Sequence, residues 1–298
     1  MQQTRSIHIF DFIKGRLRDY AQLTKVTLSM WIVFSAVFGF VFVAENITFI
    51  QVLYLALGGF FITGASNTLN QIFEIDTDKL MKRTAQRPLP TERMTSMEAL
   101  LWAGVQAILG TMLLWLKFNG LAAFLGLISL ISYAMVYTPM KRVSSIAVFI
   151  GAVPGALPPM IGAVAAQGFL SFEAVLLFFI QFFWQFPHFW AIGWIGFNDY
   201  KNAGFHLLPS KIGKDSHTAI YSILYACVTV LMSVLPVYFG IINVYFIFPI
   251  LLLGFFFVYK SLQLLRLQTD VSARSLMFAS IIYIPLLQIV LIISKLCN

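Results

Sequence analysis

The chain has 298 residues, of which 59% are hydrophobic and only 11% are charged. Soluble domains carry roughly 25% charged residues, so this composition excludes an ordinary water-soluble globule and indicates an integral membrane protein. The net charge of +8 does not indicate a nucleic-acid partner, because the cations follow the pattern that orients membrane proteins instead of forming one basic surface.

Nine apolar segments are long enough to cross a hydrocarbon core of roughly 30 Å, which requires about 20 helical residues. We therefore predict an all-α integral membrane protein with nine transmembrane helices, folded as a single domain over residues 1–298. The predicted spans are 26–43, 50–69, 99–116, 121–137, 146–166, 174–197, 218–238, 244–259 and 276–294.

Lysines and arginines concentrate in alternate loops between these spans. If the N-terminus is cytoplasmic, every Lys and Arg except Lys117 and Lys295 falls on the cytoplasmic side. This distribution is the positive-inside pattern of polytopic membrane proteins. It predicts a cytoplasmic N-terminal segment (1–25), two long cytoplasmic loops (71–98 and 198–217), and a functional face on that side.

The stretch NQIFEIDTDKLMKRTAQRP begins at Asn70 and concentrates acids and cations at the end of the second span. Asn70, Glu74 and Asp78 are spaced four residues apart, so on a continuing helix they project from nearly one side. Such oxygens suit Mg²⁺, and Arg83 and Arg87 add planar donors for phosphate. A solvated loop is the alternative, but polar groups at the end of an apolar span indicate function. We therefore predict a magnesium-bridged diphosphate site.

Two features inside the predicted spans also indicate function. His188 lies in WQFPHFW within the sixth span, where a polar imidazole is either a functional group or a hydrogen-bonded packing residue. The stretch GAVPGALPPMIG in the fifth span contains three prolines, which predict a broken helix. Such a break would either widen the wall of a cavity or form a simple kink.

The order N-x-x-x-[D/E]-x-x-x-D followed by M-x-R-T-x-x-R-P resembles the first aspartate-rich motif of the intramembrane prenyltransferase superfamily. LTK before the first span, YTPMKR, GAVPGALPPMIG, WQFPHFW and NDYKNAGFHLLP resemble its protoheme IX farnesyltransferase branch, also called heme O synthases. The resemblance covers nearly the whole chain. It implies nine transmembrane helices around a central cavity that the two motif loops cap on the cytoplasmic side.

The resemblance also implies roles for individual residues. Asn70, Glu74 and Asp78 would hold Mg²⁺ and the leaving group of farnesyl diphosphate, with Asp199 of the second motif as a further metal ligand. That motif retains one acid only, because Ala203 stands where most of the superfamily has a second aspartate. The heme would contact Trp184 and His188. The cations expected to neutralise the diphosphate are Lys25, Arg83, Arg87, Lys141 and Arg142.

The implied reaction transfers a farnesyl group to a vinyl group of heme b, adds water, and gives heme O and diphosphate. Mg²⁺ and cations would promote ionisation of the allylic diphosphate, and a dry chamber with aromatic faces would tolerate the carbocation. A heme A synthase or oxidase assembly factors are the implied downstream partners. The short N-terminus, without a long Arg- and Ser-rich leader, favours a bacterial plasma membrane.

Two other functions stay open. A prenyltransferase for an aromatic or quinone-precursor acceptor would share the first motif, although the stretches WQFPHFW and NDYKNAG favour heme. A membrane transporter would use intramembrane polar groups and a broken helix, but here the charges cluster at one face and not near the midplane.

Overall fold

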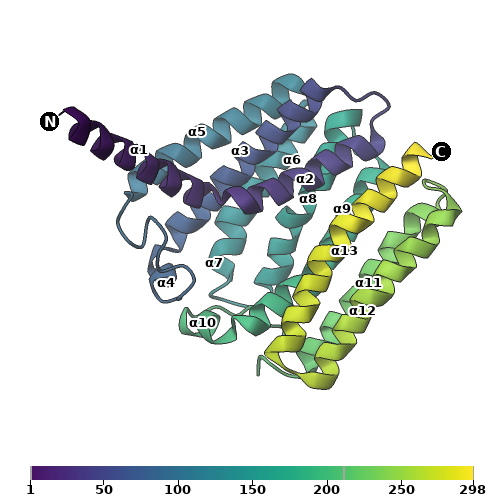
Figure 1. The fold of residues 1–298 in the computed structure, drawn as a ribbon. Helices are drawn as coiled ribbons and strands as arrows, with labels where there is room; N and C mark the ends of the chain where they lie inside the picture. The colour runs from purple at the N-terminus through teal and green to yellow at the C-terminus, as the bar shows by residue number, and fades with distance from the viewer. Residues whose placement is uncertain (1, 211, 298) are drawn as a thin grey trace.

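The computed structural model describes residues 2–210 and 212–297; Lys211, one of the cations assigned to the cytoplasmic side, lies outside them. In the described residues all regular structure is helical, and nine helical segments are long and apolar enough to cross a membrane (Figure 1). These spans are α2 (Val26–Val43), α3 (Phe49–Phe73), α5 (Ser96–Lys117), α6 with its continuation (Gly120–Met140), α8 (Ala147–Gln167), α9 (Phe172–Ile195), α11 (Ser216–Tyr238), η2 with α12 (Val244–Leu267) and α13 (Asp270–Leu296).

The predicted number of spans is confirmed for this part of the chain. The last two spans are longer than predicted, because Lys260 and Arg266 lie within α12 and Arg274 lies within α13 instead of in a loop. Helical hydrogen bonding therefore continues past the apolar window that hydropathy detects.

Side chains just before the first turn start several of the spans. Thr48 accepts a hydrogen bond from the backbone N–H of Gln51, and the Gln51 side chain accepts one from Thr48 in return. Such capping bonds satisfy amides that the helix itself leaves without a partner. Among the described residues the same role falls to Thr95, Asn119, Ser171, Asp215 and Thr269.

Several further elements are too polar or too short for hydropathy to predict. The N-terminal helix α1 projects from the bundle, whereas α4 and α10, one from each motif loop, lie at the same end of it (Figure 1). Their bounds are α1 (Gln2–Thr24), α4 (Ile75–Lys79) and α10 (Phe197–Asn202). The fourth span changes type along its length, from α6 (Gly120–Ile131) through the π-helix η1 (Ser132–Tyr137) to α7 (Thr138–Met140). The eighth span begins with the 3-10 helix η2 (Val244–Phe246) and continues as α12 (Ile247–Leu267).

The most enclosed span is α8, with 78% of its window buried inside the structure. It is an unbroken helix although it contains Pro154, Pro158 and Pro159, so the prediction of a broken helix is wrong. Pro158 has no N–H for the Pro154 carbonyl, and that carbonyl instead accepts a hydrogen bond from Ser129 Oγ of α6 at 3.2 Å. A neighbouring helix thus satisfies one of the backbone groups that the prolines free.

Glycines allow α2 and α8 to approach closely. A Cβ atom at Gly162 would overlap the backbone of Ala36, and one at Gly39 would overlap the backbone of Pro159. Small residues at such crossings let transmembrane helices gain van der Waals contact, since lipid supplies no hydrophobic drive between helices. The crossing holds α2, and with it the preceding Lys25, against the central helix.

Large apolar side chains cover the outer faces of the peripheral helices. Trp115 and Leu116 of α5 and Phe248 and Phe255 of α12 are all exposed. Apolar surface of this extent marks a membrane or protein contact in a stable fold. Together with the spans, it identifies an integral membrane protein.

Candidate active site

A cavity of about 310 Å³ lies at the end of the bundle that carries α4 and α10. Its lining includes residues from α3, α4 and the first motif loop, together with residues from η1, α9 and the second motif loop. Its charged and amide lining consists of Lys25, Asn70, Glu74, Asp78, Arg83, Arg87 and Lys141. Its ring-bearing lining consists of Tyr133, Tyr137, His188, Phe189, Tyr200 and Phe205.

The polar stripe on the second span continues across a helix break. Helix α3 ends at Phe73, and α4 resumes after the single residue Glu74. The Glu74 N–H donates to the Asn70 carbonyl at 3.1 Å, and the Asp78 N–H donates to the Glu74 carbonyl at 2.7 Å. Asn70, Glu74 and Asp78 are buried and all line the cavity, as their spacing predicts.

Each of the two carboxylates contacts a cation and retains an oxygen that accepts no hydrogen bond from the described residues. Arg87 Nη1 donates to Asp78 Oδ2 at 2.6 Å, while Asp78 Oδ1 is buried without a hydrogen-bond partner. Glu74 Oε1 forms an ion pair with Lys141 but lacks the alignment of a hydrogen bond. Buried oxygens of this kind are unfavourable unless something else binds them.

These oxygens fit a hard divalent cation. With the Asn70 amide they provide an oxygen set of the type that Mg²⁺ prefers. Within residues 2–210 and 212–297, no group of three or more His, Cys, Asp and Glu side chains is arranged to hold a metal. With Glu74 and Asp78 as the carboxylates that line the cavity, the site suits an ion that takes one or two protein carboxylates and completes its coordination with phosphate and water.

Cations outnumber carboxylates in the cavity wall: Lys25, Arg83, Arg87 and Lys141 face Glu74 and Asp78 among the residues described. An excess of positive charge in a cleft attracts anions. Burial, together with the charge of Arg87, lowers the pKa of Lys25 to about 7. Burial raises the pKa of Asp78, although Arg87 opposes the rise. A bound anion would favour the charged form of Lys25.

The corner that carries Lys25 has an unusual backbone. Lys25 lies between α1 and α2 with φ 50° and ψ 56°, a left-handed conformation that non-glycine residues rarely adopt. Its Nζ lies 3.3 Å from Asn70 Oδ1. Gln71 Nε2 donates to the Leu23 carbonyl at 2.8 Å, which helps to hold the corner. Such conformations persist where the surroundings enforce them, often at functional sites.

The π-helix η1 brings two tyrosines to the cavity. The Thr138 N–H donates to the Tyr133 carbonyl five residues back, and the Tyr133 and Tyr137 rings lie 5.3 Å apart. The Lys141 ammonium lies 4.8 Å from the centroid of the Tyr137 ring. π-Helical turns frequently mark functional sites. The sequence did not single out these rings, because 30 Phe and 11 Tyr leave too many equivalent candidates.

His188 belongs to the same cavity, whereas Trp184 does not line it. The His188 ring stacks on Trp184 with centroids 5.0 Å apart, and its Nδ1 lies 2.8 Å from Ser280 Oγ of α13. The indole N–H of Trp184 donates to the Ser280 carbonyl at 2.7 Å. Trp184 therefore supports His188 from the side away from the cavity.

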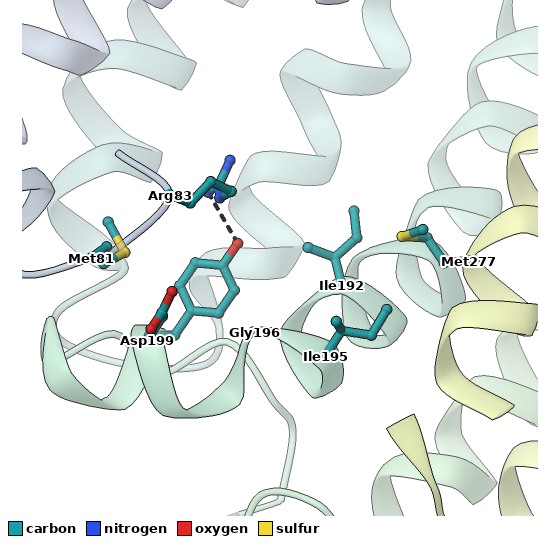
Figure 2. Close-up of a pocket in the computed structure, with 8 residues that line it drawn as sticks. Met81, Arg83, Ile192, Ile195, Gly196, Asp199 and Met277 are labelled. Carbon is teal, nitrogen blue, oxygen red and sulfur yellow. Dashed lines mark hydrogen bonds between the residues drawn. The ribbon is translucent and has the colours of Figure 1, made fainter. Parts of the chain in front are cut away.

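Neither Asp199 nor Arg142 is among the residues that line the cavity. Asp199 lines a neighbouring hollow of about 150 Å³ (Figure 2). The dashed line there is the hydrogen bond of 3.4 Å from Arg83 to the Tyr200 hydroxyl. Arg142 is exposed, and its Nη2 lies 3.5 Å from Thr77 Oγ1. The two hollows share Met81, Arg83, Ile192 and Tyr200 as lining residues.

Comparison with known proteins identifies the family. The UbiA prenyltransferase family matches residues 32–282. The chain belongs to this family. A UbiA relative from Christiangramia forsetii, named protoheme IX farnesyltransferase, is 46% identical over 284 residues, which cover 94% of each chain. A second protein of that name, from Flavobacterium johnsoniae, is 42% identical over 95% of this chain and 96% of its own.

Solved structures share the UbiA fold. A digeranylgeranylglyceryl phosphate synthase structure aligns with a TM-score of 0.80 at 21% identity, covering 95% of this chain and all of that one. A UbiA homologue from Archaeoglobus fulgidus bound to GPP and Mg²⁺ aligns with a TM-score of 0.63 at 16% identity, over 92% of this chain and 99% of that one. The predicted family and the all-helical membrane fold are confirmed.

Proposed function

We propose that the chain transfers a farnesyl group from farnesyl diphosphate to a vinyl group of heme b, with addition of water, and releases heme O and diphosphate. One observation carries the proposal: buried carboxylates and cations line the same cavity as aromatic side chains and the His188 imidazole. The relatives named protoheme IX farnesyltransferase, which share more than two fifths of their residues with the chain, favour this acceptor over a quinone precursor.

In this proposal the diphosphate end of the donor binds among the charged and amide side chains of the cavity. Asn70, Glu74 and Asp78 would hold Mg²⁺, which when bound neutralises diphosphate oxygens as a Lewis acid. The buried Asp78 Oδ1, which has no partner among the described residues, supports this role, and so does the Mg²⁺ in the GPP-bound A. fulgidus homologue. The cations assigned to the diphosphate are Lys25, Arg83, Arg87 and Lys141.

These cations would also promote departure of the diphosphate. Breaking the allylic C–O bond moves negative charge onto the leaving oxygens, and preorganised positive groups stabilise that charge. The Tyr133 and Tyr137 rings, which line the same cavity, offer π faces to the allylic cation. The cavity lies in a bundle whose outer faces are apolar, an arrangement that would keep bulk water away until the vinyl carbon has reacted.

The acceptor would contact His188 among the aromatic side chains of the cavity, since an imidazole can bind the iron of a heme. Arg142, Asp199 and Trp184 do not line this cavity. Their predicted roles in binding diphosphate, metal and heme stay predictions.

The proposal includes a location. The cation distribution supports a cytoplasmic N-terminus and motif loops on the cytoplasmic side of a bacterial plasma membrane. The chain would act as a single domain, and its product would pass to a heme A synthase or to oxidase assembly factors.

The test is a product assay with the full chain purified in detergent. Heme b, farnesyl diphosphate and Mg²⁺ are incubated with the protein, and the porphyrins are separated by chromatography and weighed by mass spectrometry. A more hydrophobic heme with the added mass of a farnesyl group and a hydroxyl group is the expected result. Farnesylation of 4-hydroxybenzoate, with heme b unchanged, would overturn the proposal.

A further inference from the structure

A short chain of hydrogen-bonding groups connects His188 of α9 to the backbone of α13. His188 Nδ1 lies 2.8 Å from Ser280 Oγ, and Ser280 Oγ lies 2.6 Å from the Met277 carbonyl oxygen. Ser280 is fully buried. The chain therefore ends at a carbonyl, which can only accept a hydrogen bond.

The carbonyl sets the direction of both hydrogen bonds. The single hydroxyl proton of Ser280 satisfies the Met277 carbonyl, so His188 Nδ1 must carry the proton that it shares with Ser280 Oγ. The reverse arrangement would place Ser280 Oγ against the Met277 oxygen with no proton between them. It would also put the His188 proton on Nε2, which forms no hydrogen bond with any described residue.

The ring position follows from the same contacts. Ser280 occupies the Nδ1 edge, and Trp184 stacks on one face of the ring while its indole N–H donates to the Ser280 carbonyl. Because His188 also lines the cavity, the edge left for a ligand is the one that carries Nε2. In the Nδ1–H tautomer, Nε2 has a free lone pair, the form in which imidazole binds a metal.

We propose that Ser280 is a positioning residue that fixes the tautomer and orientation of His188, so that Nε2 is the axial ligand of the iron in protoheme. The inference rests on the proposed function, since it specifies how His188 contacts the heme substrate. Ser280 itself does not touch substrate. Its effect is the one that outer-shell partners of metal-binding histidines exert, and loss of such a partner typically lowers metal affinity by about 10- to 100-fold.

Binding of two porphyrins distinguishes positioning from packing. Ferric protoheme and metal-free protoporphyrin IX have the same macrocycle, but only the first can accept a histidine ligand. Each is titrated into the full-length protein in detergent and followed by its Soret band. We expect Ser280→Ala to weaken binding of ferric protoheme by about 10- to 100-fold and to leave binding of protoporphyrin IX unchanged.

Ser261 provides the matched control. It is a fully buried serine of α12 whose hydroxyl donates to the Phe257 carbonyl at 3.1 Å, and it forms no hydrogen bond with a histidine of the described chain. Ser261→Ala likewise removes a buried hydroxyl that donates to a carbonyl of its own helix, so binding of both porphyrins should remain at the wild-type level. In a His188→Ala background, Ser280→Ala should cause no further loss of affinity for ferric protoheme.

Three results would overturn the inference in distinguishable ways. An equal loss of affinity for both porphyrins in Ser280→Ala would show that Ser280 has a packing role. If Ser280→Ala kept wild-type affinity for ferric protoheme while His188→Ala lost it, the role of Ser280 would be rejected. The contact between His188 and the heme would then stand. Unchanged affinity in His188→Ala would reject the iron ligand itself, while the product assay reports separately on the proposed function.

Discussion

Replacing Asp78 with asparagine tests the proposed metal and diphosphate site most directly, because the substitution removes a charge and preserves the side-chain shape. Asp78 is fully buried, with Oδ2 on Arg87 at 2.6 Å and Oδ1 without a partner among the described residues. An amide provides one oxygen in place of two charged ones. Loss of one preorganised group at a developing charge typically lowers kcat by about 10²–10³, or about 2.7–4 kcal/mol. We expect at least that loss in Asp78→Asn.

The substitution also leaves Arg87 without its ion-pair partner. Breaking a buried pair from one side costs about 3–5 kcal/mol of stability, and the 17% exposure of the Arg87 side chain makes that range an upper bound. Thermal unfolding in detergent must therefore accompany the kinetics. A folded variant with a lowered kcat isolates the catalytic effect.

Asp76 supplies the control for this experiment. It lies on the same short helix but is exposed and does not line the cavity. Asp76→Asn should leave kcat near the wild-type value, because the exposed side chain does not line the cavity. Farnesyl transfer to heme b is measured for both variants over a range of Mg²⁺ concentrations. Wild-type kcat in Asp78→Asn, or an equal loss in Asp76→Asn, would refute the reasoning.

Three further substitutions test other parts of the fold and site. His188→Ala should lose affinity for heme b but keep farnesyl diphosphate binding, and equilibrium binding that shows the opposite would contradict its placement. Lys141→Met should raise KM for farnesyl diphosphate by about 10-fold or more, since a hydrogen bond to a charged group contributes about 1.5–3 kcal/mol; the exposed Arg142→Met should not. Gly162→Ala should lower the melting temperature through overpacking of about 1–3 kcal/mol, whereas Gly104→Ala, with open space around it in the described structure, should not.

The spans and the polar stripe were predictable because local rules determine them. Lipid requires about 20 apolar residues in each helix, so hydropathy finds the spans without knowledge of their packing. The stripe depends only on helical periodicity, which continues from Asn70 to Asp78 through the hydrogen bonds around Glu74.

Features that depend on contacts between distant segments were not predictable. The three prolines of α8 suggested a break, but Ser129 from another helix satisfies the Pro154 carbonyl. The family resemblance grouped Asp199 with the stripe, and the structure places it in a neighbouring hollow that shares Arg83 and Tyr200 with the cavity. Neither outcome can be read from the segment in which the residue lies, because its partner is contributed from elsewhere in the chain.

The π-helical turn Ser132–Tyr137 makes the fourth span sensitive to length. A turn closed over five residues contains one residue more than an α-helical turn. Rewinding this segment as α-helix without changing its length would rotate everything after it by about 100°, which would turn Lys141 away from Glu74. The π-helical turn therefore absorbs one residue, and Lys141 keeps its place beside Glu74 only while the segment stays π-helical.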